Sequence, residues 1–381
     1  MKPFLYSILF LISISTSFSQ TEELVLKKSF EVDQNTVLNL DIDNATIQFV
    51  ESTEDKIHID YSILFNKNSE EIVYKAFKDL SASATKSGNT INLEVKNSMF
   101  LGELYYIEVD IDTYKKHIKN YFRNIKSNKL SYKSKDSLLK EIHFSSGPDS
   151  NDYFRKLKRE NPNKHFGKLN RKFKQKFVIK APKYLALKIK ALRSKINFNY
   201  DVLKPIELNS FNTYLKFKKL ENSNNKFSLY SGIFQSEKVV GGTYFFKDVS
   251  KVKIGSISNT KIDSETSKLQ FGEISKKVKI NDFNSKLYFY NLSKDFKELE
   301  CKGEYSKMTF YGVKKGNYSM SVLGHNTVLN LNEMKTTFGL SKDKKLEKIL
   351  EKKVPEGKIS EGNISLVLTN GILNLIKKTN L

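Results

Sequence analysis

A five-residue phrase recurs along this chain and constrains its fold more than any other feature. It reads Ser-Lys-apolar-x-Phe at Ser285–Phe289 and returns at Ser194–Phe198, Ser267–Phe271 and Ser306–Phe310, with weaker forms at Thr213–Phe217 and Thr327–Leu331. Successive starts are 19, 54, 18, 21 and 21 residues apart. Because 54 is three times 18, the long interval predicts two further copies whose sequence has diverged.

The phrase has the periodicity of a β-strand. Leu287 and Phe289 are two residues apart, so an extended chain points both to one face and Lys286 to the other. A second alternating run precedes each phrase, as at Val278-Lys279-Ile280, and a short turn joins the two. Such a unit of about 20 residues cannot bury its own apolar face, so copies must stack. We therefore expect a mainly β fold, a β-solenoid; an antiparallel sandwich is the alternative.

The hydroxyl residue that opens each phrase is expected to have a structural role. In a stack of copies, each Ser or Thr lies above its equivalent. There its hydroxyl can hydrogen-bond to the backbone of the turn.

The N-terminal segment, residues 1–19, has the features of a secretory signal peptide. Lys2 precedes an apolar run from Phe4 to Ile14, and small residues follow at Ser17-x-Ser19. The run is too short to be a membrane span, and no later run of about 20 apolar residues provides a transmembrane anchor. The sequence therefore predicts an exported protein, periplasmic or extracellular.

Four further segments follow the signal peptide. Residues 20–112 carry the repeat pattern at Val37–Phe49 and form the N-terminal part of the predicted solenoid, with a short helix at Glu70–Leu80. Residues 113–174 lack the phrase and contain 18 Lys and Arg against 5 Asp and Glu. They are predicted to be a basic insertion, partly helical or flexible, with helical spacing at Thr113–Lys126 and Ser134–Ile142. The repeats occupy residues 175–335, and residues 336–381 are predicted to form a helix at Asp343–Lys353 and closing strands.

The repeat pattern resembles the adhesin-like β-solenoid domains of unknown function that occur in exported bacterial proteins. The resemblance rests on Val178-Ile179-Lys180-Ala181-Pro182-x-x-Leu185-x-Leu187-x-Ile189, on Ser194-x-Ile196-x-Phe198 with its later copies, and on Leu40-Asp41-Ile42-x-Asn44-x-x-Ile47. It implies a right-handed parallel stack of β-coils and supplies no enzymatic residues. The chain departs from the family in its basic insertion and in using Ser-Lys where the family commonly has a glycine at the turn.

The charge of the chain indicates an anionic partner. There are 65 Lys and Arg against 42 Asp and Glu, a formal net charge of +23. Such a surface attracts nucleic acid, acidic polysaccharide or membrane phosphates, and export disfavours nucleic acid. The single cysteine, Cys301, excludes an intramolecular disulfide and a paired-cysteine site, and it is expected to be buried as a small apolar residue.

Lysines at outward positions of the repeats are the candidate anion-binding residues. Strands about 4.8 Å apart would align them in a row. The candidates are Lys195, Lys216, Lys268, Lys286 and Lys307, with Lys261 at a similar position and Tyr214, Tyr288 and Tyr311 as stacking platforms. The alternative is that these lysines only prevent aggregation and edge pairing. The predicted function is non-catalytic binding of an acidic glycan or of envelope phosphate groups.

The enzymatic alternative is a polysaccharide lyase or hydrolase. Its candidate acids are Asp263, Glu265, Glu273 and Asp282, and catalysis needs two carboxyls roughly 5–10 Å apart in a groove. On a lysine-rich stack such acids are expected to pair with lysines, so no catalytic residue is assigned. No metal or cofactor is predicted, because glycine-rich phosphate-binding motifs are absent and the histidines are isolated, at His58, His117, His143, His165 and His325.

Overall fold

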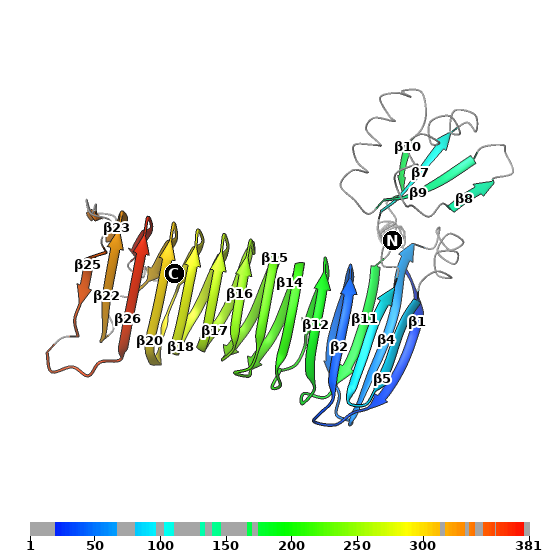
Figure 1. Cartoon of the computed structure of the whole chain (residues 1–381), viewed down its shortest axis with the longest axis horizontal. Coiled ribbons are helices and arrows are strands. Elements are labelled where there is room, and N and C mark those ends of the chain that lie inside the picture. Colours follow the sequence, from blue (N-terminus) through cyan, green and yellow to red (C-terminus); the bar gives the residue numbers. More distant parts are fainter. Residues whose placement is uncertain are drawn as a thin grey trace, which may run out of the picture. The chain divides into compact units, whose positions relative to one another are not determined.

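The fold is mainly β and consists of two compact units. The computed structural model describes residues 20–66, 81–96, 103–109, 130–133, 139–145, 166–169, 174–312, 317–331, 335–339, 346–354 and 356–376, and these contain strands but no helix. One unit spans residues 27–60, 83–94 and 177–381, and the other spans residues 1–26, 61–82 and 95–176. The larger unit holds a long series of strands that lie side by side (Figure 1).

A ladder of parallel strands, which we call the first ladder, runs through this larger unit. Ala186–Leu192 pairs in parallel with Val37–Asp43 on one side and with Ile206–Phe211 on the other. The strands that contribute to it, in spatial order, are β6 (Thr90–Lys96), β2 (Val37–Asp43), β12 (Ala186–Leu192), β14 (Ile206–Glu221), β15 (Lys226–Val240), β16 (Thr243–Lys247), β17 (Lys251–Glu265), β18 (Lys268–Phe283), β20 (Leu292–Glu304), β26 (Gly362–Thr369), β22 (Tyr318–His325) and β25 (Glu347–Lys352).

After each strand of the first ladder the chain turns, and the segment that follows contributes to a second parallel ladder. It uses β3 (Ala45–Glu51), β13 (Lys195–Phe198), the middle of β14 and β15, the first parts of β17 and β18, β19 (Lys286–Phe289), β21 (Lys307–Tyr311), β27 (Ile372–Ile376), β23 (Thr327–Leu331) and β24 (Lys335–Gly339). The strands of both ladders are parallel, except that β24 and β25 pair antiparallel with β23 and β22. An antiparallel sandwich would not give these parallel neighbours.

The long interval between the repeat phrases is filled by paired strands. Thr213 lies opposite Gly232 and Ile233 lies opposite Lys251, while Val252 lies opposite Leu269 in the following turn. Two further turns, which begin at Gly232 and Ser250, therefore lie between the phrases at Thr213 and Ser267. Their sequences lack the phrase because Gly232-Ile233-Phe234 and Ser250-Lys251-Val252 keep only the alternation.

The order of the strands in space departs from their order in the chain near the C-terminus. β26 pairs with β20 on one side and with β22 on the other, and β27 lies in the same way between β21 and β23. The final strands, residues 362–376, therefore lie inside the stack, between two turns that are consecutive in sequence.

The phenylalanine of the repeat phrase builds the interior of the stack. Phe49, Phe198 and Phe217 stack with ring centroids 4.2 Å and 4.7 Å apart, and Phe289 lies 5.4 Å from Phe271 and 4.3 Å from Phe310. The apolar residue two positions earlier is also buried: Leu269, Leu287 and Met308 are register partners and fully inaccessible to solvent. Both inward positions of the phrase thus form continuous buried rows, which remove apolar surface from water.

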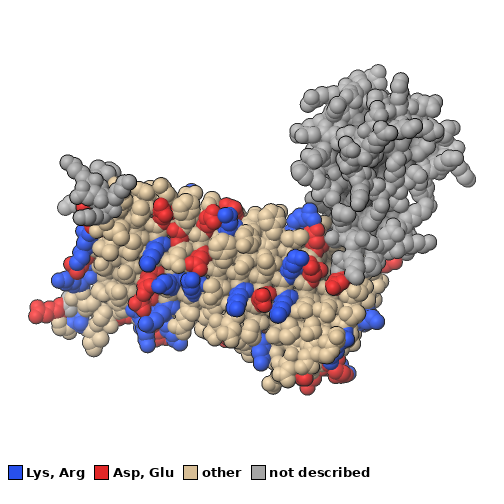
Figure 2. Space-filling view, in the orientation of Figure 1, with Lys and Arg blue, Asp and Glu red and all other residues tan. Residues whose placement is uncertain are grey.

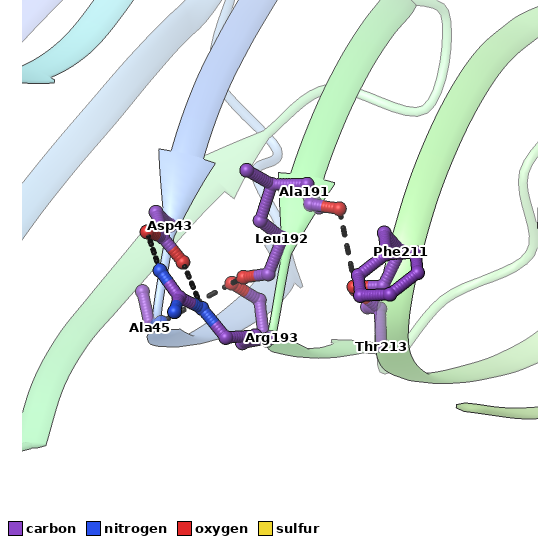
Figure 3. Close-up of polar contacts among 8 residues, drawn as sticks. Asp43, Ala45, Ala191, Leu192, Arg193, Phe211 and Thr213 are labelled. Carbon is purple, nitrogen blue, oxygen red and sulfur yellow. Dashed lines mark hydrogen bonds and ion pairs between the residues drawn. The ribbon is translucent and has the colours of Figure 1, made fainter. Parts of the chain in front are cut away.

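The turn between the two ladders combines a left-handed residue with a buried hydroxyl. Arg193, Asn212, Thr266, Asn284 and Tyr305 have φ between 45° and 56°, a region that glycine adopts without strain. The residue after each is a buried Ser or Thr whose hydroxyl donates to the carbonyl two positions earlier, as Ser267 does to Glu265 at 2.8 Å. Thr213 also bonds to Ala191 in the neighbouring turn, at 3.3 Å (Figure 3). The expected structural role of these hydroxyls is confirmed.

Two predicted helices are wrong. Residues 347–352 of the segment Asp343–Lys353 form strand β25, because the outer edge of β22 offers backbone hydrogen-bond partners along its length. Residues 139–142 of the segment Ser134–Ile142 belong to β9 (Leu139–Ser145), which pairs antiparallel on both sides. The helices predicted at Glu70–Leu80 and Thr113–Lys126 and the signal peptide lie outside the described residues.

The smaller unit contains an antiparallel sheet with the order β10-β7-β9-β8. Its strands are β7 (Glu103–Val109), β8 (Leu130–Lys133), β9 and β10 (Phe166–Leu169). The described part of the predicted insertion, residues 113–174, is therefore strand rather than helix, and β7 adds residues that precede it. The remaining strands, β1 (Gln20–Glu31), β4 (Lys56–Asn66), β5 (Ser81–Ser87) and β11 (Lys174–Ala181), belong to the long sheet.

Candidate anion-binding face

The outward side chains of the second ladder form a surface that we call the lysine face. Two rows of residues cross it, because each strand of this ladder contributes two outward positions to the paired region. The first row is Lys195, Tyr214, Ile233, Lys251, Lys268, Lys286 and Lys307, and the second is Asn197, Lys216, Gln235, Lys253, Gln270, Tyr288 and Thr309. Seven of these fourteen side chains are lysines.

Three of the five predicted lysines are direct neighbours. Lys268 lies opposite Lys286, and Lys286 lies opposite Lys307, on adjacent strands. Lys195 is in the same row but separated from them by the turns of Tyr214, Ile233 and Lys251, while Lys216 is in the second row. All five predicted lysines thus lie on one face, but only three of them form an unbroken series.

Lys261 lies elsewhere. It is opposite Thr243 and Lys279 in the first ladder and forms an ion pair with Asp263 at 3.2 Å. The reason is that β17 passes from the second ladder, through a third set of parallel pairings at Ser256–Ser258, into the first ladder, so its parts face different directions. Placing Lys261 among the aligned outward lysines was therefore wrong.

Lys251 and Lys253 belong to the lysine face although the repeat phrase did not identify them. Lys251 pairs with Ile233, and Lys253 pairs with Gln235 and Gln270. The alternation Lys251-Val252-Lys253-Ile254 carries the signal, since Val252 and Ile254 are buried. A search for alternation at the 18-residue period, without a fixed Ser-Lys start, would have found them.

The two rows of the lysine face contain no carboxylate. Among the fourteen positions of the two rows no Asp or Glu occurs, and none of the seven lysines forms an ion pair within the part of the chain that the structure describes. Lys195, Lys216, Lys253, Lys268, Lys286 and Lys307 are exposed, and Lys251 is half-buried. The positive charge of these rows is consequently not neutralised by an acid among the described residues.

The outward face of the first ladder has the opposite organisation. Five of its basic side chains form ion pairs with acids of the same or the adjacent strand: Lys190 with Asp41, Arg193 with Asp43, Lys247 with Glu265, Lys261 with Asp263, and Lys279 with Glu300. The exposed Lys188, Lys226 and Lys302 of this ladder form no ion pair with the described residues. Figure 2 shows one face of the unit on which basic and acidic side chains lie side by side. The hydrogen bond from Lys247 to Glu265 raises the pKa of that lysine, as expected when a carboxylate favours the charged form.

Aromatic and amide side chains lie between the lysines. The ammonium groups of Lys195 and Lys268 lie 5.3 Å and 5.7 Å from the ring centres of Tyr214 and Tyr288. Next to this row, Tyr290 and Tyr311 stack with their ring centroids 4.9 Å apart and their planes 2° from parallel. These residues include the predicted platforms Tyr214, Tyr288 and Tyr311, and Tyr290 adds a fourth ring.

The four candidate acids of the enzymatic alternative each have a partner. Asp263 accepts a hydrogen bond from Asn281 at 2.7 Å and pairs with Lys261, Glu265 pairs with Lys247 at 2.9 Å, and Glu273 accepts from Asn291 at 3.2 Å. The outward pair Asp263 and Glu265 is therefore held by lysines, in the arrangement expected of structural surface pairs.

Asp282 differs from the other acids because it points into the stack. Its carboxylate is buried and accepts hydrogen bonds from the hydroxyls of Ser264 and Ser306, the latter at 2.5 Å, and from the backbone N–H of Ser285 at 3.2 Å. Burial, and secondarily the Asp282 carboxylate, raises the pKa of the Cys301 thiol well above its usual range. Cys301 is buried, as predicted.

Other kinds of site have little support in the described residues. No group of three or more His, Cys, Asp and Glu side chains there is arranged to hold a metal ion. A shallow polar depression lies on the first ladder between Asn39, Asp41, Asn92, Lys188 and Lys190, but its cations and acids are mixed. Within the described part of the chain, no helix of the length and hydrophobicity of a membrane span is present.

Comparison with known proteins identifies no family. No family model matches the chain, and no curated protein matches it. Solved structures that resemble it include a "putative adhesin" from Bacteroides fragilis (8% identity, TM-score 0.32, covering 95% of this chain and 99% of that one) and another from Parabacteroides merdae (10%, 0.27, 95% and 98%). A third is a "putative lipid binding protein" from Parabacteroides distasonis (10%, 0.26, 94% and 97%). Superpositions this loose leave the function to be inferred from this chain's own side chains.

Proposed function

We propose that this chain is an exported, non-catalytic, adhesin-like β-solenoid that binds an anionic component of an envelope or of the extracellular medium through the lysine face. The single observation that carries the proposal is the absence of any carboxylate among the fourteen positions of the two rows, seven of which are lysines. The right-handed sense of the coil is part of the proposal and is supported by the strong preference of parallel crossover connections for that hand.

The spacing of the lysines suits a ligand with repeated negative charges. Adjacent strands of a sheet are about 4.8 Å apart, so Lys251, Lys268, Lys286 and Lys307 place four ammonium groups over roughly 15 Å. Charges this close act together over a Debye length of about 8 Å at physiological ionic strength. A polymer of acidic sugars or an array of phosphates can engage several lysines at once, which raises avidity without any deep pocket.

The aromatic residues next to the lysines fit the same class of ligand. Tyr288 lies between the lysine row and Tyr290, and the parallel Tyr290–Tyr311 pair presents ring surface at the edge of the face. Such rings can pack against the apolar face of a sugar while the lysines contact its acidic groups. The enzymatic alternative has less support, because the outward acids Asp263 and Glu265 already pair with lysines.

The test compares two triple variants of the full chain with equal charge loss. In one, Lys268, Lys286 and Lys307 are replaced by Gln; in the other, Lys247, Lys261 and Lys279 of the first ladder are replaced by Gln. Retention on an immobilised acidic glycan is measured against salt concentration. We expect the first variant to elute at clearly lower salt, while the second stays close to the parent because its lysines are already neutralised by acids.

The basic segment of residues 113–174 is present in both variants, so its contribution to retention cancels in the comparison. Equal elution of the two variants would show that retention follows total charge, and the lysine face would then not be the binding site. Circular dichroism of both variants checks that neither substitution disturbs the strands.

A further inference from the structure

Exposed apolar side chains line both long edges of the lysine face. Of the eleven large apolar residues that are exposed in the described part of the chain, seven lie at these two edges. On the edge shared with the first ladder, Leu192, Phe211 and Tyr230 are register partners on three consecutive strands, with 38%, 54% and 39% of their surface exposed. Monomeric proteins rarely leave such contiguous apolar groups in water without a partner.

The same edge carries a second aromatic pair further along the stack. Phe283 and Tyr305 are 44% and 54% exposed, and their ring centroids are 5.8 Å apart. The Lys247–Glu265 ion pair occupies the positions between the two groups. The edge is therefore apolar at both ends of the lysine series.

The opposite edge has the same character. Tyr290 stacks on Tyr311, and Tyr311 lies opposite Ile376 on the next strand. Tyr290 and Ile376 are 39% and 40% exposed. The lysine face thus has cations along its middle and apolar rings or aliphatic groups along both sides.

We propose that the lysine face docks on the surface of an anionic lipid bilayer. Lysines in the middle match a layer of negatively charged headgroups, while aromatic rings at the edges suit the boundary between headgroups and acyl chains. A soluble acidic glycan could contact the lysines and the Tyr290–Tyr311 pair, but it would leave the apolar residues of the other edge, such as Phe211 and Phe283, in water. The inference rests on the proposed function, because it needs the same lysines to attract the anion.

The strength of such docking follows from many weak contacts. Each lysine near an anionic bilayer strengthens partitioning about fivefold, so losing three is expected to weaken it by about a hundredfold. Partly inserted aromatic side chains add apolar burial, and losing three of them is expected to weaken it by roughly tenfold. Both effects are large enough to measure by vesicle sedimentation.

The experiment uses the full chain and vesicles of phosphatidylcholine with or without phosphatidylglycerol. The edge variant replaces Phe211, Tyr230 and Phe283 by Ser. Its control replaces Leu203 and Ile359 by Ser; these two are 46% and 88% exposed but lie outside the edges of the lysine face. The triple Lys268, Lys286 and Lys307 variant is measured in parallel, and all proteins are also tested on the acidic glycan.

We expect the parent to bind vesicles that contain phosphatidylglycerol and not pure phosphatidylcholine. The edge variant should bind them roughly tenfold more weakly, with unchanged glycan retention, and its control should match the parent. Unchanged vesicle binding of the edge variant, or glycan retention without any vesicle binding by the parent, overturns the lipid inference alone. If the lysine variant matches the parent on both ligands, the proposed function fails as well.

Discussion

The first and second ladders of the larger unit have the same backbone pairing, but their outward side chains differ in charge. Their strands alternate along one chain, share one interior and pair in the same parallel sense. On the first ladder several charged residues form ion pairs, such as Lys279 with Glu300 at 3.0 Å, whereas the two rows of the second ladder carry seven lysines and no acid. The stack therefore forms with either kind of surface, and the fold does not require unpaired lysines.

This difference argues against solubility as the sole reason for the lysines. Lysine protects a sheet best at exposed edge strands, where an unpaired backbone invites association. Lys268 and Lys286 instead lie on strands paired on both sides. Solubility alone is also served by mixed charges, as on the first ladder.

The largest expected effect comes from breaking the interior that both ladders share. Phe289→Ala removes a ring that lies between Phe271 and Phe310 and leaves a cavity. We expect a loss of about 3–5 kcal/mol in the free energy of unfolding, measured by chemical denaturation. Tyr288→Ala, at the adjacent outward position, is the control and should cost less than about 1 kcal/mol. Equal losses for the two would contradict the assignment of inside and outside.

A slightly smaller loss is expected at the buried carboxylate. Asp282→Ala leaves the hydroxyl of Ser264 and the N–H of Ser285 without their acceptor and removes one of the two acceptors near the Ser306 hydroxyl, which we expect to destabilise the stack by about 3 kcal/mol. Asp282→Asn keeps one acceptor and should lose less. The denaturation midpoint measures both. Stability of Asp282→Ala equal to that of the parent would show that these hydrogen bonds contribute little.

The difference between the surfaces can be reduced by adding acid to the lysine face. Gln270→Glu places a carboxylate beside Lys253 and among Lys268 and Lys286. We expect retention on the acidic glycan to weaken by roughly three- to tenfold, because the new acid competes for these lysines. Asn209→Glu, on the first ladder, adds the same charge and should have less than half of this effect. If both variants weaken binding equally, only net charge matters.

The smallest expected effect concerns the turn between the ladders. Thr266 is β-branched and has φ of 48°, so Thr266→Gly relieves backbone strain. Because glycine also loses more entropy on folding, the net gain should be about 0.5–1 kcal/mol in thermal or chemical unfolding. Thr243→Gly, at an outward strand position, is the control and should be destabilising. A destabilising Thr266→Gly would mean that the side chain contributes more than the strain costs.

Much of the stack could be predicted from the sequence because its rules are local. The two-residue alternation in Leu287 and Phe289 defines an inward face wherever it occurs, and a hydroxyl at Ser285 or Ser306 marks a turn. Even the diverged turns at Gly232 and Ser250 follow from the interval between copies. Lys268, Lys286 and Lys307 are neighbours for the same reason.

Features that depend on distant parts of the chain could not be predicted. Nothing in Glu347–Lys352 indicates that it will extend along the edge of β22, and its apolar spacing also fits a helix. The absence of acids from the two rows is also hidden, because Lys261 and Asp263 are close to Lys268 in the chain. The strand register places Lys261 and Asp263 in the first ladder and Lys268 in the second. The left-handed turn residue is also hidden, since Arg193, Thr266 and Tyr305 share no side-chain chemistry.

The position of β26 and β27 inside the stack has a consequence for assembly. The turn formed by residues 318–331 has no parallel neighbour until residues 362–376 have been synthesised and have entered beside it. Growth of the stack by simple addition of each new turn must therefore pause after β21. The C-terminal end of the stack is completed only when β26 and β27 insert between the two turns that flank them. Completion of this end is therefore a late and non-local event in folding.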